Sequence, residues 1–121
     1  MNVKQHTISV RHALDGVRQA FTTQPNFRIH LFLSAGAVFL GIVLRIDHWE
    51  WIILSLVITV GLVIEMINTA IESVVDLISS QWHLAAKTAK DVSAGAMLIY
   101  AIGSMILAGL LFAPKILWLF I

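Results

Sequence analysis

The residues best suited to chemistry lie in one short stretch of the chain, EMINTAIESVVD, at positions 65–76. If this stretch is helical, its polar side chains project within about 100° of one another, because successive residues turn by ~100°. They are Glu65, Asn68, Thr69, Glu72 and Asp76. Carboxylates accept protons from hydroxyl groups or bind divalent cations. Two helical turns, ~10.5 Å, separate Glu65 from Glu72, which is too far for the two to bind one metal ion as a pair. We therefore expect one to act on a hydroxyl and the other on a cation.

The residues around this polar stripe are almost all apolar, which makes its charges costly. A charged side chain at the centre of a membrane-spanning helix costs at least ~2.5 kcal/mol, so several on one face require a cation, a partner or water. The loop that follows offers only two basic residues, Lys87 and Lys90, for three acids. We therefore expect a functional site at Glu65 and Glu72. Asp76, near the helix end, fits a cap or an ion pair as well as a functional role.

Composition places these residues in a membrane protein. The chain has 121 residues, of which 59% are hydrophobic and 12% charged, whereas soluble domains carry about 25% charged residues. This length predicts a single domain, 1–121. The absence of cysteine excludes disulfides and thiol nucleophiles, and a net charge of +1 does not favour nucleic acid as a partner.

The hydropathy pattern predicts an all-α fold. Uncharged runs at 31–44, 51–64 and 92–114 indicate three transmembrane helices, near 29–46, 49–78 and 92–119. Before them, apolar residues recur at helical spacing and predict an amphipathic surface helix over about 6–23, with a turn at Pro25 and Asn26.

The basic residues predict how these helices cross the membrane. Six lie on one side of a three-span arrangement: Lys4, Arg11, Arg18, Arg28, Lys87 and Lys90. Only Arg45 and Lys115 lie on the other side. Positive charge favours the inner side, so we expect the N-terminus of this multi-pass chain to be cytoplasmic.

The loop before the last span carries no glycine-rich phosphate loop of the GxxxxGK[ST] type. A nucleotide would therefore be held by carboxylate-bound metal and isolated cations. Lys90 lies where it reaches a phosphate, although a lysine there is equally an ordinary membrane-surface residue. The small residues at 93–96 favour close packing of helices.

Three segments resemble the prokaryotic diacylglycerol kinase family of small membrane lipid kinases, and its undecaprenol kinase branch in particular. They are NFRIH at 26–30, EMINTAIESVVDL at 65–77 and LAAKTAKDVSAGAMLI at 84–99. The motif at 65–76 is the most specific of them. With the order of the spans, the resemblance extends over nearly the whole chain.

The resemblance implies a homotrimeric bundle with active sites shared between chains, in which a lipid hydroxyl receives the γ-phosphoryl group of ATP. Glu65 matches the catalytic base, and Glu72 matches a glutamate that binds Mg²⁺. The implied nucleotide-binding residues are Lys90, Asp91, His83, Glu72, Gln24 and His12. Glu65, Asn68 and Arg28 match lipid-binding positions.

Two positions depart from the family pattern. Gln24 stands where the family usually has a second metal-binding glutamate, and Gln81 replaces an acid found in some members. An amide oxygen can bind Mg²⁺ but adds no negative charge, so we expect weaker metal binding or a contact through water. Asp91 or Asp76 is an alternative source of that charge.

The most direct interpretation is ATP- and Mg²⁺-dependent phosphorylation of undecaprenol to undecaprenyl phosphate at the cytoplasmic interface. Diacylglycerol, which would yield phosphatidic acid, is the alternative substrate, because periodicity does not reveal the shape of a lipid groove. Two alternatives come from other classes: a small multidrug transporter, which needs four spans, and a noncatalytic membrane subunit that has kept the scaffold.

Overall fold

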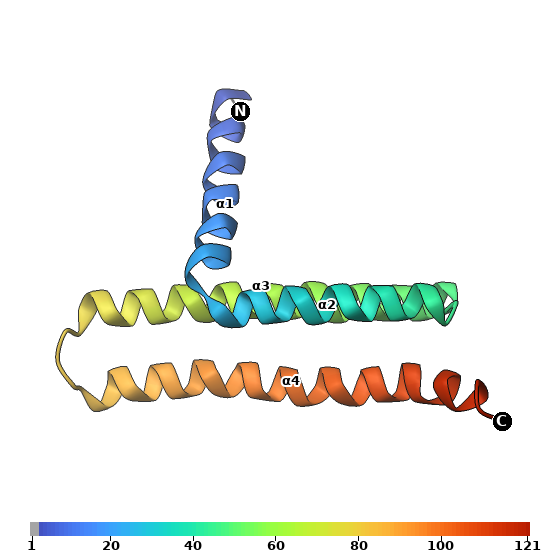
Figure 1. The fold of residues 1–121 in the computed structure, drawn as a ribbon. Coiled ribbons are helices and arrows are strands. Elements are labelled where there is room, and N and C mark those ends of the chain that lie inside the picture. Colours follow the sequence, from blue (N-terminus) through green and yellow to red (C-terminus); the bar gives the residue numbers. More distant parts are fainter. Residues whose placement is uncertain (1–2) are drawn as a thin grey trace.

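A computed structural model describes the backbone of residues 3–121 and the side chains from residue 9 onward. The side chain of Lys4 thus lies outside the described part. The helices are α1 (Val3–Thr23), α2 (Pro25–Val43), α3 (His48–Ile78) and α4 (Leu84–Trp118). In Figure 1, α2, α3 and α4 run alongside one another, and α1 projects from them at a steep angle. The prediction of an all-α fold is confirmed.

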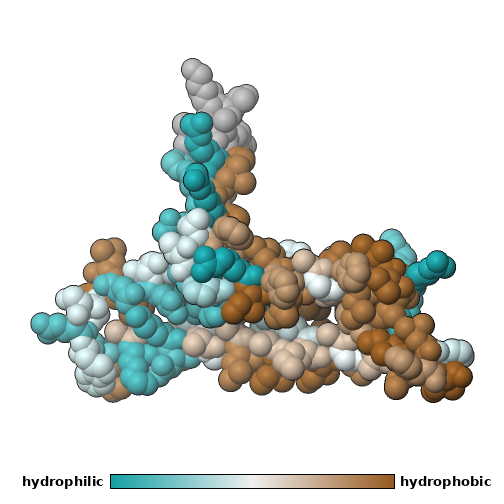
Figure 2. All heavy atoms as spheres, viewed as in Figure 1, coloured by the Kyte–Doolittle hydropathy of each residue, from teal (hydrophilic) through white to brown (hydrophobic). Residues whose placement is uncertain are grey.

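Helices α2, α3 and α4 are each long and apolar enough to cross a membrane, as the hydropathy pattern predicted. At 1.5 Å per residue, α3 (31 residues) and α4 (35 residues) extend ~46 and ~52 Å, well beyond the ~30 Å of hydrocarbon in a bilayer. Both continue past the beginning of α2 (Figure 1). Hydrophilic residues gather on this protruding end, whereas hydrophobic residues cover most of the rest of the visible bundle face (Figure 2).

The helices differ from the predicted spans mainly at their ends, where polar residues extend a helix beyond its apolar part. Helix α4 begins at Leu84, eight residues before the predicted span at 92–119, because the polar segment ahead of it is also helical. His83 caps this helix, its Nδ1 accepting a hydrogen bond from the Ala85 amide. Hydropathy marks the part of a helix that suits lipid, not the whole helix.

Helix α1 turns directly into α2 at Gln24, which has extended backbone angles. The predicted turn at Pro25 and Asn26 is wrong, because Pro25 is the first residue of α2, where its missing N–H group costs no hydrogen bond. Ala20 is 2% exposed beside this junction. A methyl group added at Gly16 would lie 3.9 Å from Met66, so α1 crosses α3 one residue from Glu65.

At the opposite end, the turn between α2 and α3 is tightly held. Asp47 caps α3 by accepting from the amides of Trp49 and Glu50, and the Glu50 side chain accepts in return from the Asp47 amide. Glu50 also pairs with Lys115 of α4 at 3.0 Å. The buried hydrophobic cluster lies at this end and contains Ile46, Leu54 and Phe112.

Candidate functional site

Glu65 is the most buried charged residue of the described part, with 2% of its surface exposed. It lies on α3 at the level where α1 crosses that helix. Among the described side chains, none forms an ion pair with it. The polar stripe is therefore turned into the molecule at this position, and no arginine neutralises it. Burying an unpaired carboxylate costs folding free energy. A residue of this kind is therefore a candidate for a functional role.

One and two turns further along α3, Asn68 and Glu72 form a connected polar group with Ser93 of α4. The Ser93 hydroxyl donates to Asn68 Oδ1 at 2.5 Å, and Asn68 Nδ2 donates to Glu72 Oε1 at 3.3 Å. Ser93 is only 7% exposed. The small residues at 93–96 predicted close packing of helices, but the hydrogen bond from Ser93 was not predicted. No local signal reveals this contact, because the two residues are 25 positions apart.

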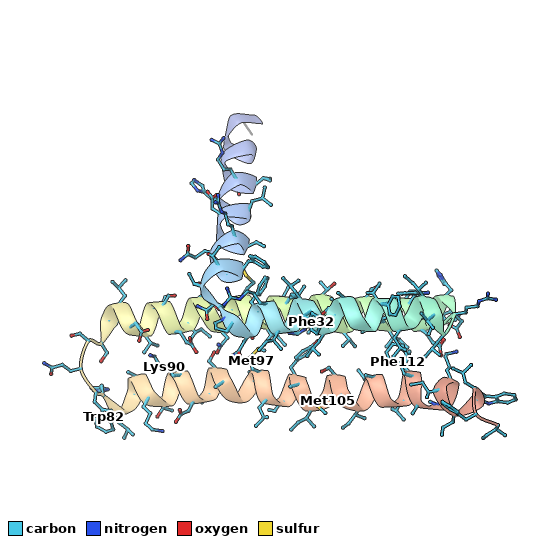
Figure 3. All side chains as sticks on the ribbon, viewed as in Figure 1. Phe32, Trp82, Lys90, Met97, Met105 and Phe112 are labelled. Carbon is cyan, nitrogen blue, oxygen red and sulfur yellow. The ribbon has the colours of Figure 1, made fainter. Side chains whose placement is uncertain are left out.

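The last acid of the stripe is neutralised. Asp76 Oδ1 accepts from Lys90 Nζ at 2.5 Å, and Lys90 extends from α4 toward α3 (Figure 3). Lys87 forms an ion pair with Asp91 on the same helix, four residues along. All four side chains are at least 41% exposed. Of the two interpretations of Asp76, the ion pair is the one that the structure contains, and Lys90 and Asp91 remain accessible to solvent.

A pair of aromatic rings closes the space on the apolar side of Glu65. His30 of α2 and Tyr100 of α4 stack with ring centroids 5.5 Å apart and planes inclined by 22°. Both rings lie over Gly61, where an added methyl carbon would come within 2.4 Å of them. The Tyr100 hydroxyl donates to the backbone oxygen of Val57. Gly61 and Glu65 are one turn apart on the same buried face, so the rings form a floor below the carboxylate.

On one side of the α3–α4 pair, the two helices line a groove with a volume of about 860 Å³. Its walls are mainly apolar, with Ile64, Ile67 and Ile71 on α3 and Val92 on α4. Asn68 and Ser93 also line it, and His83 lies at its loop end. A mainly apolar groove with a few polar groups has the composition expected for a site that receives an amphipathic molecule.

Among the described side chains, no hydrogen bond or ion pair joins the remaining predicted site residues to Glu72. Gln24 is half-buried and donates to the Thr23 hydroxyl, and Arg28 donates to the backbone oxygen of Thr22. His12 is exposed on α1, and His83 caps α4. Gln81 is exposed, with its backbone oxygen bound to the Ser79 hydroxyl. A metal site shared by Gln24 and Glu72 therefore stays a prediction.

The oxygen atoms near Glu72 suit Mg²⁺ if a nucleotide supplies further ligands. Within the described part, no three acidic or histidine side chains lie close enough to hold a metal by themselves. Mg²⁺, however, prefers oxygen ligands and is commonly held by one or two carboxylates together with substrate phosphates and water. Glu72 is such a carboxylate, and Asn68 steadies it. The residues present fit an ion that arrives with a nucleotide.

Comparison with known proteins gives a consistent picture. The family model for prokaryotic diacylglycerol kinase matches residues 11–112. A diacylglycerol kinase of Synechocystis is 40% identical over 94% of this chain, which spans 66% of that relative, just under two thirds of its length. An undecaprenol kinase of Bacillus subtilis is 37% identical over 87% of this chain and 85% of its own length. The diacylglycerol kinase of Escherichia coli K12 is 32% identical over 75% of each chain.

Proposed function

Because this chain belongs to the prokaryotic diacylglycerol kinase family of lipid kinases, we propose that it transfers the γ-phosphoryl group of ATP to undecaprenol at the inner membrane. Relatives named for diacylglycerol and for undecaprenol are similar to nearly the same degree. The match to the undecaprenol kinase extends over 85% of that relative, against 66% for the Synechocystis diacylglycerol kinase. Coverage alone does not choose the lipid, because a diacylglycerol kinase is also matched over 89% of its own length. The resemblance of the segments at 26–30, 65–77 and 84–99 to the undecaprenol kinase branch supports the polyprenol as substrate, with diacylglycerol as the alternative.

The observation that carries this proposal is the separation of two unlike carboxylates along α3. Glu65 is buried where α1 crosses the bundle, and Glu72 lies two turns, ~10.5 Å, further into the protruding polar end. A lipid hydroxyl stays at the membrane surface, whereas ATP is dissolved in water. Two carboxylates placed in this way serve the two substrates separately.

In the proposed reaction, the oxygen of the lipid hydroxyl attacks the γ-phosphorus of ATP, and Glu65 accepts the proton of that hydroxyl. The new O–P bond forms as the bond to the bridging oxygen of ADP breaks. The rings of His30 and Tyr100 lie over Gly61, one turn from Glu65 on its apolar side, so we expect the hydroxyl to approach Glu65 from the polar side. Positioning and charge stabilisation supply most of the catalysis in phosphoryl transfer.

Glu72 and Gln24 would hold Mg²⁺. When bound, the ion neutralises charge on the ATP phosphates. Lys90 adds a positive charge within reach of the same phosphates, and Asp91, His83 and His12 complete the nucleotide-binding surface. Arg28 and Asn68 contact the lipid headgroup. The ion pair between Lys90 and Asp76 is exposed, which allows the lysine to exchange partners at little cost.

We also propose that the active enzyme is a homotrimer with a cytoplasmic N-terminus and with α1 lying on the membrane surface. The apolar residues of α1 that the sequence predicted for its membrane side are exposed: Val10, Leu14, Val17 and Phe21. The basic side chains Lys87 and Lys90 lie at the protruding end, opposite Arg45 and Lys115.

The direct test supplies purified protein in lipid nanodiscs with Mg·ATP and equal amounts of polyprenol and diacylglycerol. We expect polyprenyl phosphate as the main product in mass spectra. Excess phosphatidic acid would overturn the choice of lipid but leave the kinase in place. If neither lipid is phosphorylated, the proposed activity is wrong. Light scattering of the same sample measures the oligomer, and a mass other than that of a trimer would contradict the shared site.

A further inference from the structure

The hydroxyl of Ser93 is a buried polar group that the proposed reaction leaves without a role. It is 7% exposed and lies on α4, opposite the polar stripe of α3. Its hydrogen bond to Asn68 Oδ1, 2.5 Å long, joins two helices at positions 25 residues apart. Buried hydroxyls nearly always have a partner, but the choice of this particular partner has a consequence for Glu72.

The consequence follows from the asymmetry of the Asn68 side chain. Its amide presents an acceptor, Oδ1, on one side and a donor, Nδ2, on the other. Because the Ser93 hydroxyl donates to Oδ1, the Nδ2 group is directed to Glu72 Oε1 at 3.3 Å. Without that hydrogen bond, Asn68 loses its anchor on α4 and its side chain is free to leave the rotamer that reaches Glu72.

A fixed donor on Glu72 Oε1 has two effects on this carboxylate. It holds the side chain in one orientation, four residues from Asn68 on the same helix face. It also occupies a lone pair of Oε1 and leaves Oε2 for another ligand. Groups that orient metal ligands in this way contribute strongly to affinity, and their removal typically weakens metal binding 10–100-fold.

We propose that Ser93 is a positioning residue for the metal-binding carboxylate: through Asn68 it holds Glu72 ready for a divalent cation. This inference rests on the proposed function, because it takes Glu72 as the residue that binds the cation. In this role Ser93 acts through Asn68 and not on the reacting atoms. Its effect therefore appears in the binding of the cation before any turnover.

The test measures binding of Mn²⁺, as a probe for Mg²⁺, by electron paramagnetic resonance of the protein in detergent with a nonhydrolysable ATP analogue. For Ser93→Ala we expect the dissociation constant of Mn²⁺ to rise about tenfold. Ser93→Thr keeps a hydroxyl and should restore most of the affinity. The matched control is Ser104→Ala, since Ser104 is on the same helix, about three turns from Ser93, and donates to the backbone oxygen of Ala101. It should bind Mn²⁺ like the wild type.

A second measurement separates positioning from general damage to the fold. In an Asn68→Ala background, Ser93→Ala should have no further effect on Mn²⁺ binding, because the connecting amide is already gone. An equal loss in both backgrounds would overturn the proposal. So would wild-type affinity of Ser93→Ala when Glu72→Gln has lost binding. If Glu72→Gln itself binds Mn²⁺ normally, the metal assignment fails, and this inference fails with it, even where lipid phosphorylation persists.

Discussion

The two ends of the α3–α4 pair both contain carboxylates, but only one end leaves a carboxylate without a charged partner. At the end near the α2–α3 turn, Asp47 caps a helix, and Glu50 completes the capping box and pairs with Lys115. At the protruding end, Asp76 and Asp91 pair with lysines. Between that end and the middle of α3, Glu65 is buried without an ion pair among the described side chains.

The packing differs in the same sense. The buried hydrophobic cluster of Ile46, Leu54 and Phe112 fills the end near the α2–α3 turn. Toward the other end, α3 and α4 line a groove of about 860 Å³. Charges with charged partners have a structural role, whereas a buried carboxylate without one is a candidate for chemistry. The molecule thus has one region that holds the helices together and another that carries the candidate functional site.

Replacing the unpaired carboxylate should have the largest effect on activity. We expect Glu65→Gln to lower the rate of lipid phosphorylation 10²–10⁴-fold, the range typical of a lost general base. Thermal stability should stay the same or rise, because the substitution removes a buried charge. The rate is measured with polyprenol and Mg·ATP, and the binding of a nonhydrolysable ATP analogue is the control. Retention of full activity would exclude Glu65 as the base.

The next effect concerns the aromatic floor beneath that carboxylate. Gly61→Ala would place a methyl group within 2.4 Å of the His30 and Tyr100 rings, so these rings must shift. Overpacking of this kind typically costs 1–3 kcal/mol, which is more than the ~1 kcal/mol gained by replacing a helical glycine. We expect a lower melting temperature and lower activity. Gly103→Ala is the matched control, because no atom lies within 4 Å of its added methyl group, and it should be neutral or stabilising.

A substitution at the end near the α2–α3 turn should lower the stability of the protein without lowering its activity. Glu50→Gln weakens a capping box and the pair with Lys115, whose side chains are 23% and 29% exposed, and should cost about 1 kcal/mol. Chemical denaturation measures the loss, and the lipid kinase assay checks that turnover per folded protein is unchanged. A large fall in turnover with little loss of stability would contradict the division into two regions.

The smallest effect should come from the exposed ion pair within α4. Lys87→Ala removes a contact with Asp91 whose side chains are 56% and 62% exposed, and such pairs contribute about 0.3–0.5 kcal/mol. Lys90→Ala should change stability as little but raise the KM for ATP. Similar kinetics for the two variants would mean that Lys90 has no special place in the nucleotide site.

The fold and the candidate site were predictable to different extents. Hydropathy and the helical period identified three apolar helices and the stripe of Glu65, Asn68, Glu72 and Asp76, because both depend on residues close in the chain. The floor of His30 and Tyr100 was missed, and so was the contact of Ser93 with Asn68. Gly61 was the only local signal for the floor, and a glycine in an apolar helix does not indicate which side chains pack against it.

By itself, the sequence determined that the chain is a membrane protein built from helices and that one helix carries several acids on a single face. The tertiary structure decided which of those acids is paired, which is buried alone and which is held by an amide. The physical reason is that a helix sets the angles of its own side chains through local hydrogen bonds. The alignment of one helix against another depends on the packing of residues 14 to 43 positions apart, as between Asp76 and Lys90 or between Val57 and Tyr100.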